Sequence, residues 1–531
     1  MQEYRNRENR GDNFRQAIKH TTFYYAKRVV FSGLLVTGLL LLAQIGLLIL
    51  MFVWVSNYAH LFFEGYTLFG VVCMILIIND DTTPEYKIAW MIPIAIFPIV
   101  GSLMFLYLKY NIGTIAPRKV LQRITKETSA YTYTNPEVKT AIHSEHTDIE
   151  KLSDYLEKNG GCCTYSNSSM EYFSLGDDVV DTLVEELKKA KEFIFIEFFM
   201  IEEGIFFNQI LEILTEKVKE GVEVRVMYDD LGCVVLLPRK YSEKLKCRGI
   251  NVRTYAHLTP FLSTHYNNRD HRKILVVDGK FALSGGINLC DEYINAYEKF
   301  GHWKDNAYVV RGEAVKSFTL MFLQMWNSVL YRPNLDYEKY LITYPIKGRD
   351  GYIIPYGDGP HQDETVAKNV YMDILNNAKD YVYIMTPYLI LDHEMESTIS
   401  HAAMSGIDVR IILPHIPDKK IPFSIARTYY PKLLHAGVKI YEYEPGFIHS
   451  KTFLSDDKIG VVGTINLDYR SLYLHYECAG IFYKCDGLKD IKNDFTSTFA
   501  KCIEVDIKYY HKINIINRFF GRIWSIFGPL M

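Results

Sequence analysis

The chain has 531 residues, with 59 Lys and Arg against 62 Asp and Glu, and a formal net charge of −3 at pH 7. This length allows a membrane segment and two ordinary domains. The near-neutral charge provides no steering toward nucleic acid, which argues against a nucleic-acid partner. The nine cysteines include no CxxC pair, so we expect reduced thiols in a packed interior and no metal site built from them.

Two long stretches of the N-terminal part carry no charged residue. Residues 29–55 exceed the ~20 residues that a helix needs to cross the hydrocarbon core of a bilayer. Residues 88–108 form the second stretch, and its two prolines are compatible with a membrane helix because neighbouring helices satisfy the freed carbonyls. Residues 66–78 are apolar but short, and fit a third crossing, a re-entrant segment or a buried helix. We therefore expect two or three transmembrane helices within residues 29–110.

Basic residues flank this membrane segment on both sides. The leader, residues 1–28, contains seven Lys and Arg residues, and five more follow the second stretch: Lys109, Arg118, Lys119, Arg123 and Lys126. The positive-inside rule places both flanks in the cytoplasm, which requires an even number of crossings. We expect a multi-pass protein of the cell membrane whose catalytic region faces the cytoplasm.

The remainder of the chain contains an internal repeat. Residues 190–196 resemble 378–384, and 221–226 resemble 406–411; each is a β-rich run next to a helix-like segment. Strand and helix alternate in the same order in both halves, which predicts α/β layers around a largely parallel sheet. The repeat spacing, near 180 residues, indicates a duplicated domain rather than a short-period solenoid.

This repeat sets the expected domain boundaries. Residues 111–165 are polar and lack sustained apolar periodicity, which predicts a linker and lead-in region. We expect the first domain at residues 166–345 and the second at 346–505. Residues 506–531 would form a basic amphipathic C-terminal segment.

Each half carries the same polar motif at the same spacing. The first copy is His271, Lys273, Asp278, Gly285 and Asn288, and the second is His449, Lys451, Asp456, Gly463 and Asn466. In the first half an apolar run after the lysine ends at Asp278-Gly279, which predicts a hairpin, and Asp456-Asp457 takes the same place in the second. Residues two apart on a strand emerge on one face, so each histidine would lie beside its lysine.

This pairing suits phosphodiester chemistry. An imidazole can attack phosphorus or protonate a leaving group, while a fixed cation stabilises the phosphate oxygens. The glycines let backbone amides approach an anion, and Asn288 or Asn466 can add a donor. One such motif would more often be structural, but two matching copies favour one active site shared by the halves. One histidine would attack and the other would serve the leaving group.

The paired motifs resemble the phospholipase D superfamily, and the finer match is to bacterial cardiolipin synthases. The resemblance covers nearly everything from about Thr67 to the C-terminus. It rests on the following segments: 267–273, 278–280, 285–288, Glu292-Tyr293 and 303–305 in the first half; 463–471 and Glu477 in the second; and Ala89-Trp90, 97–101 and 528–531 outside them. Two departures bear on acceptor preference. Residues 387–391 lack an aromatic and proline common in the family, and His475 stands where Asn often occurs.

The resemblance implies two fused phospholipase D-like domains with pseudo-twofold symmetry that share one active site. It further implies that His271 attacks phosphatidylglycerol, forming a phosphatidyl-histidine, while His449 protonates the departing glycerol. His449 would then activate a second phosphatidylglycerol, which yields cardiolipin. Because one phosphodiester replaces another, we expect neither a cofactor nor a metal.

Supporting residues follow from the same resemblance. The phosphate oxygens would be held by Lys273, Lys451, Asn288 and Asn466. Asp305 and Glu477 are candidates to fix the histidine tautomers through the other ring nitrogen. Asp278 and Asp456 belong to the catalytic motif, but their positions at strand ends favour a structural role, bracing a turn or a basic neighbour.

Other functions remain open. A different phosphatidyltransferase, or a phospholipase D hydrolase, would use the same residues on other acceptors. A nuclease is disfavoured by the apolar spans and the lack of basic charge. A lipid-binding scaffold with a decayed site is disfavoured by the two intact motifs.

The C-terminal segment indicates contact with lipid. Basic and apolar residues alternate there: Lys508, Lys512, Arg518 and Arg522 with Ile513, Ile516, Phe519, Phe520, Ile523 and Trp524. This pattern fits an anionic membrane surface, and equally a helix packed on the catalytic domain. The expected partners are phosphatidylglycerol and anionic membrane lipids, and the oligomeric state stays open.

Overall fold

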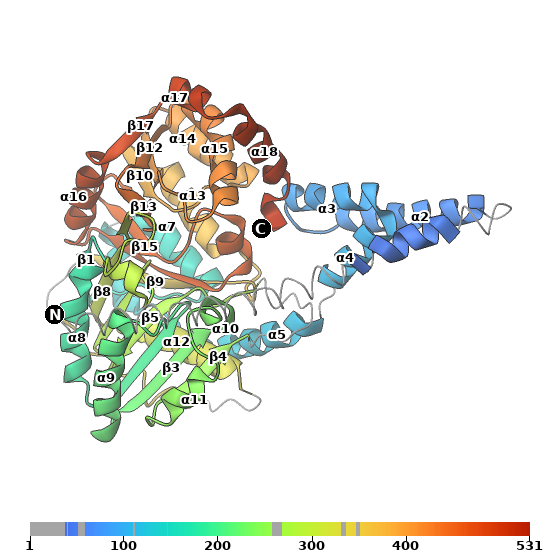
Figure 1. Cartoon of the computed structure of the whole chain (residues 1–531). Coiled ribbons are helices and arrows are strands. Elements are labelled where there is room, and N and C mark those ends of the chain that lie inside the picture. The colour runs from blue at the N-terminus through green and yellow to red at the C-terminus, as the bar shows by residue number, and fades with distance from the viewer. Residues whose placement is uncertain are drawn as a thin grey trace, which may run out of the picture. The chain divides into compact units, whose positions relative to one another are not determined.

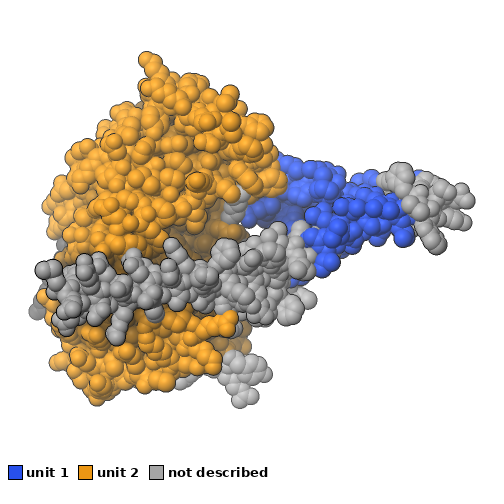
Figure 2. Space-filling model, in the orientation of Figure 1, with its two compact units in different colours: residues 1–115, 257–266, 530 blue, residues 116–256, 267–529, 531 orange. Residues whose placement is uncertain are grey.

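The computed structural model describes residues 38–39, 41–50, 59–109, 112–145, 147–256, 268–330, 336–346 and 351–530. They form two compact units (Figure 2). The smaller comes from the N-terminal part through residue 115, and the larger covers residues 116–256 and 267–529. The predicted leader, 1–28, lies outside the described residues. So does most of the first predicted span, of which residues 38–39 and 41–50 are described and helical.

Three of the described helices in the N-terminal unit pack together. They are α2 (Ala59–Ile78), α3 (Pro84–Ile96) and α4 (Pro98–Lys109). They pack on one another around a small apolar core of Cys73, Ile77, Trp90, Ile94 and Phe105. The short segment 66–78 is thus part of α2.

The second predicted span, 88–108, is divided between α3 and α4. The break falls at Phe97, because Pro98 has no N–H to continue the helix and instead begins α4. Gly101 lies so close to α3 that a Cβ there would be 2.7 Å from the backbone of Pro93. Among the described residues, no helix combines the length and apolar character needed to cross a bilayer.

The larger unit contains two lobes of one design (Figure 1). The strands of the first are β1 (Ser168–Phe173), β2 (Phe193–Phe198), β3 (Glu223–Asp229), β4 (Asn251–Tyr255), β5 (Lys273–Val277), β6 (Phe281–Gly285), β7 (His302–Lys304) and β8 (Ala307–Gly312). Its helices are α8 (Val180–Lys189), α9 (Ile205–Lys219), α10 (Asp230–Cys233), α11 (Tyr241–Lys246) and α12 (Val315–Ser328).

The second lobe repeats this series. Its strands are β9 (Tyr352–Asp358), β10 (Tyr381–Met385), β11 (Asp408–Pro414), β12 (Lys439–Tyr443), β13 (Gly446–Ile448), β14 (Thr452–Ser455), β15 (Ile459–Gly463), β16 (Glu477–Tyr483) and β17 (Cys502–Val505). Its helices are α13 (Val366–Asn377), α14 (His393–Met404), α15 (Lys420–His435) and α16 (Leu488–Phe499).

The two main sheets have the same strand order. The first runs β1-β8-β6-β5-β2-β3-β4, and the second runs β9-β16-β15-β14-β10-β11-β12 with β17 added at the end. The sequence repeats therefore correspond to β2 and β3 in one lobe and β10 and β11 in the other. The expectation of a largely parallel sheet is wrong. Within these two described sheets, only the strands of β2-β3-β4 and of β10-β11-β12 pair in parallel, because the hairpin after each histidine introduces antiparallel strands.

Alternating side chains give each sheet two apolar faces. On β2, Ile194 and Ile196 point to the core beneath α8 and α9, whereas Phe195 points to a core that both lobes share. The second lobe contributes residues such as Val462 and Phe482 to that shared core. The ring of Phe482 lies 5.2 Å from that of Tyr308 across it. The lobes are therefore joined by a continuous buried interior.

The region expected to be a linker, 111–165, is mostly helical. It contains α5 (Ile112–Glu127), α6 (Pro136–Glu145) and α7 (Thr147–Tyr155). Leu121 and Ile124 of α5 enter the shared core, and apolar residues of α6 and α7 pack on the second lobe. At 10 and 9 residues, α6 and α7 are too short for their periodicity to stand out in the sequence.

Two helices close the chain, α17 (Ile507–Lys512) and α18 (Ile515–Ile526). Gly521 fits α18 closely against α15, since a Cβ there would lie 2.6 Å from the carbonyl oxygen of Ser424. The large apolar residues of α18, including Phe519 and Phe520, remain exposed. The segment thus packs on the second lobe through one narrow face only.

Candidate active site

The two histidines of the repeated motif are held across the boundary between the lobes. His271 directly precedes Arg272 and β5, and its backbone N–H donates to the carbonyl of Tyr476 at 2.9 Å. His449 occupies the same place in the second lobe, and its N–H donates to Lys304 at 2.7 Å. β7 also pairs in parallel with β13, just before His449. Each histidine is therefore fixed by backbone of the opposite lobe.

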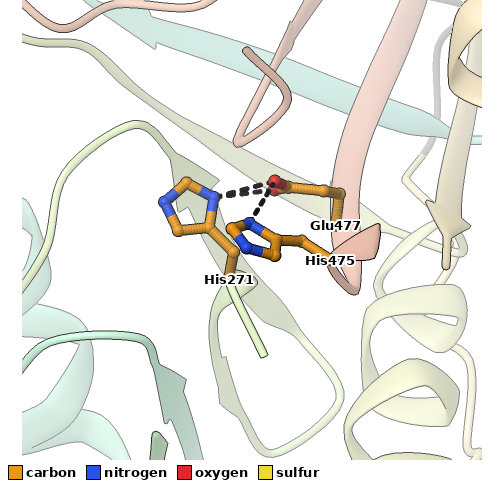
Figure 3. Close-up of side chains that lie close together, drawn as sticks. All are labelled: His271, His475 and Glu477. Atoms are coloured by element: carbon orange, nitrogen blue, oxygen red, sulfur yellow. Dashed lines mark hydrogen bonds and ion pairs between the residues drawn. The ribbon is translucent and has the colours of Figure 1, made fainter. Parts of the chain in front are cut away.

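Each histidine is also supported by a carboxylate of the opposite lobe. Nδ1 of His271 lies 2.9 Å from both oxygens of Glu477 (Figure 3). Nδ1 of His449 lies 2.6 Å from Asp305. The family resemblance indicated these two carboxylates but not which histidine each would contact. With Nδ1–H donating to a carboxylate, Nε2 keeps its lone pair for chemistry.

The two carboxylates are accommodated differently. The hydroxyl of Thr464 donates to Glu477. Gly286 is the counterpart of Thr464, and a Cβ there would lie 1.9 Å from an oxygen of Asp305. The shorter aspartate thus depends on the absence of a side chain, whereas the longer glutamate gains a hydrogen-bond donor. This difference breaks the symmetry of the two halves.

Both motif lysines are buried beside the histidines. Nζ of Lys273 donates to the carbonyl of His271 at 2.7 Å, and Lys451 donates to that of His449. Burial lowers the pKa of Lys273 to about 8, and burial with the nearby Lys273 charge lowers the pKa of Lys451 to about 7. Asp305 and Glu477 oppose both shifts. Such closely placed cations favour an anionic ligand.

Burial and the lysines also keep the histidines neutral. The pKa of His271 is well below its usual value because of burial, then the charges of Lys273 and Lys451. Burial and Lys451 lower the pKa of His449 to about 4, although Asp305 acts against them. Burial alone would raise the pKa of Asp305, but His449 and Lys451 outweigh it and the net pKa is lowered. A bound phosphodiester would offset the lysine charges and raise the pKa of either histidine.

The motif aspartates lie at the far ends of their strands from the histidines. Asp278 accepts from the backbone N–H groups of residues 191–193 at 2.8–2.9 Å. Asp456 accepts from those of residues 379–381 at 2.8–2.9 Å. Both have positive φ, 52° and 55°, within tight hairpin turns. Each aspartate therefore fastens the start of a central strand to the hairpin.

The asparagines predicted to bind phosphate have protein partners. Asn288 accepts from the N–H of Met200 at 3.1 Å and donates to the hydroxyl of Tyr293 at 2.7 Å. The amide of Asn466 donates to Ser471 at 3.1 Å, while its oxygen has no hydrogen-bond partner among the described residues. Their role in phosphate binding stays a prediction.

Sequence reasoning missed two groups near His271. His475, noted only as a departure from the family, has its ring 5.7 Å from that of His271. Beneath the site, Arg272 forms a buried ion pair with Glu197 at 2.6 Å. The second lobe has Met385 and Ser450 at the equivalent positions. The isolated charge of Glu197 within an apolar strand was the available signal for that pair.

Comparison with known proteins extends these observations. The family described as "Cardiolipin synthase, PLD-like domain" matches residues 183–326 and 371–501, and "Phospholipase_D-nuclease N-terminal" matches 68–109. Cardiolipin synthase 2 of Bacillus cereus is 32% identical over 87% of this chain and 90% of its own length. An uncharacterized protein of Streptococcus mutans is 46% identical over 86% of this chain and 99% of its own.

A solved structure shares the fold. Phosphatidylserine synthase of Haemophilus influenzae superposes with a TM-score of 0.55 at 13% sequence identity, covering 72% of this chain and 100% of that one. The structure and the comparisons indicate the same family. The two lobes have matching sheets, each contributes a histidine at their boundary, and the family match covers both lobes. The chain belongs to the cardiolipin synthase family of the phospholipase D superfamily.

Proposed function

We propose that the protein is a cardiolipin synthase that transfers a phosphatidyl group between two molecules of phosphatidylglycerol. The observation that carries this proposal is the crossed pairing of His271 with Glu477 and His449 with Asp305. It supplies two imidazoles, each with Nδ1 occupied and Nε2 available, beside two lysines. These groups can carry out two successive in-line displacements at phosphorus.

In the first displacement, Nε2 of His271 attacks phosphorus and the bond to the headgroup glycerol breaks. Protonated His449 gives its proton to the departing glycerol oxygen, which leaves a phosphatidyl-histidine. In the second, neutral His449 takes the proton from a glycerol hydroxyl of another phosphatidylglycerol. That oxygen displaces His271 and forms cardiolipin. Lys273 and Lys451 stabilise the phosphate oxygens in both steps.

Glu477 and Asp305 act through the histidines. As His271 forms its bond to phosphorus, its ring gains positive charge, which the buried carboxylate of Glu477 stabilises. Asp305 stabilises the protonated form of His449 in the same way. Asp278 and Asp456 preserve the hairpins that carry the lysines and take no part in proton transfer.

A membrane location would supply both substrates and limit competing attack by water. The match of residues 68–109 to a phospholipase D N-terminal family supports association with the membrane. We propose a multi-pass protein whose catalytic lobes face the cytoplasm. The exposed apolar residues of α18, together with Lys508, Lys512 and Arg522, would rest on anionic lipid.

The direct test is incubation of the purified full-length protein with labelled phosphatidylglycerol alone. We expect cardiolipin and glycerol in equal amounts. Phosphatidic acid as the sole product would identify a hydrolase instead. Transfer only after addition of another alcohol, such as serine, would identify a different phosphatidyltransferase.

A further inference from the structure

His475 lies next to the site with its hydrogen-bonding capacity unused. It directly precedes Tyr476 and β16, and its Nδ1 is 3.8 Å from Glu477, beyond hydrogen-bond distance (Figure 3). Neither ring nitrogen has a hydrogen-bond partner among the described residues. The side chain is 12% exposed, so a small ion can reach it. Buried polar groups without partners are uncommon and costly, which suggests a missing ligand.

Three donors converge at this point. His271, His475 and Glu477 each offer one atom, and these atoms lie within 4.8 Å of one another. Two imidazoles and a carboxylate are typical ligands of Zn²⁺, at about 2.0–2.2 Å from the ion. Ligands of a tetrahedral centre of that size are about 3.4 Å apart. The observed separations from Glu477, 2.9 Å for His271 and 3.8 Å for His475, bracket that distance.

We propose that His271, His475 and Glu477 form an inhibitory site for Zn²⁺ or a similar divalent transition-metal ion. The ion binds the Nδ1 lone pair of His271 and the ring proton moves from Nδ1 to Nε2, so the neutral imidazole binds without releasing a proton to solvent. The ion also takes the Glu477 oxygens that otherwise accept the Nδ1 proton. Thr464, which donates to Glu477, holds the carboxylate in place for the ion.

Inhibition follows from the position of the ion. With the ion on Nδ1, the ring proton lies on Nε2, so His271 can attack phosphorus only after that proton is lost. The positive charge that develops during attack would then meet a cation instead of a carboxylate. Lys273 opposes the ion, so we expect weaker binding than at a structural zinc centre. Inhibition rests on the proposed role of His271, whereas binding does not.

The test measures binding and activity separately. Metal-free full-length protein in detergent is titrated with Zn²⁺ by calorimetry in two buffers of different ionisation enthalpy. We expect one ion bound per chain and the same apparent binding enthalpy in both buffers, because neutral histidines release no proton on binding. The same Zn²⁺ concentrations should inhibit transfer from labelled phosphatidylglycerol, whereas Mg²⁺, which prefers oxygen ligands, should not.

Matched variants locate the site. His475→Asn should weaken Zn²⁺ binding by at least about tenfold and shift inhibition equally, each rate being compared with the same variant without zinc. His361→Asn changes another partly buried histidine, with its ring 5.6 Å from that of Tyr476, and should bind Zn²⁺ as the wild-type protein does. Cys290→Ser disrupts a separate group with Glu202 and Glu292 and should also bind as wild type.

Each outcome decides the inference. The inference would be overturned if His475→Asn bound Zn²⁺ as tightly as the wild-type protein, or if Cys290→Ser lost binding. It would also be overturned if the wild-type protein did not bind Zn²⁺. Zinc binding that depends on His475 in a protein without transferase activity would uphold the site and reject the proposed function.

Discussion

Glu477 of the second lobe holds His271 of the first, with Nδ1 of the histidine 2.9 Å from each carboxylate oxygen. Asp305 of the first lobe holds His449 of the second in return. Neither lobe therefore contains both a motif histidine and the carboxylate that supports it. The site exists only where the lobes meet, above a core to which both contribute.

A shared site requires both histidines. His271→Ala and His449→Ala should each reduce cardiolipin formation by at least about 10³-fold, because neither role can be supplied by the other residue. The measurement is conversion of labelled phosphatidylglycerol in vesicles. His143→Ala, at an exposed position of α6, serves as a control and should retain full activity. More than a tenth of the wild-type rate in either variant would contradict the shared site.

The two carboxylates should assist different events of the first displacement: Glu477 the attack by His271, and Asp305 the protonation of the departing glycerol by His449. Glu477→Gln and Asp305→Asn preserve size but remove the charge, and each should slow transfer by about 10²–10⁴-fold. A phosphatidyl ester of p-nitrophenol needs no acid for departure. Its first turnover should therefore recover in Asp305→Asn but not in Glu477→Gln.

Stopped-flow release of p-nitrophenolate measures that first turnover. His449→Ala should behave like Asp305→Asn, and His271→Ala like Glu477→Gln. The opposite grouping would assign the attack to His449. Equal loss in all four variants with this ester would reject separate attacking and protonating roles.

The paired motifs, their hairpins and the order of the repeats could be predicted because each depends on local sequence. Asp278-Gly279 specifies a turn, and the equal spacing of the two motifs identifies the duplication. The exchange of Asp305 and Glu477 could not be predicted, since it depends on how the lobes dock. Apart from these hairpins, the antiparallel pairings of each sheet were missed, because buried strands look alike in either direction.

Small residues close to the site were also beyond sequence reasoning. Gly286 is one of many glycines after a strand, and only the structure shows Asp305 against it. His475 gave a signal as a departure from the family, but its proximity to His271 depends on contact between the lobes. Spacing along the chain describes neighbours within one lobe only.

Gly286 provides a test of the fit around Asp305. In Gly286→Ala the new methyl group would occupy the position of the carboxylate, so His449 should lose its partner and activity should fall by about 10² or more. Thr464→Ala, at the equivalent position, removes one hydroxyl donor without a clash and should reduce activity by about tenfold at most. Transfer assays and thermal unfolding together separate the effect from misfolding. Equal activity in the two variants would contradict the asymmetry.

Asp278 and Asp456 should affect stability more than chemistry. Asp278→Ala leaves three backbone N–H groups without an acceptor and should lower the free energy of unfolding by about 1–3 kcal/mol. Asp278→Asn keeps one acceptor oxygen, so its free energy of unfolding should lie between those of the wild-type protein and Asp278→Ala. The measurements are thermal unfolding and the activity of the folded fraction, which should stay within about threefold of wild type. A loss of activity of about 10²-fold with an unchanged unfolding temperature would show instead that Asp278 has a catalytic role.

Lys451 should make anion binding depend on pH. With a pKa of about 7, its charge is present below that pH and lost above it. Affinity for an anion should therefore rise as pH falls and weaken, by up to about tenfold per unit, as pH rises above 7. Sulfate is a suitable probe because its own charge is constant from pH 6 to 9, roughly the range over which Lys451 titrates.

Arginine at the same position supplies the matched comparison. Lys451→Arg keeps its charge across this range, so the inhibition constant of sulfate should lose most of its slope near pH 7. Asp305 faces Lys451 and its pKa is lowered from the usual value, so it stays ionised over this range and adds no slope of its own. Lys273, with a pKa of about 8, should leave a residual slope at higher pH in both proteins. An identical slope near pH 7 in the two proteins would show that Lys451 does not titrate there.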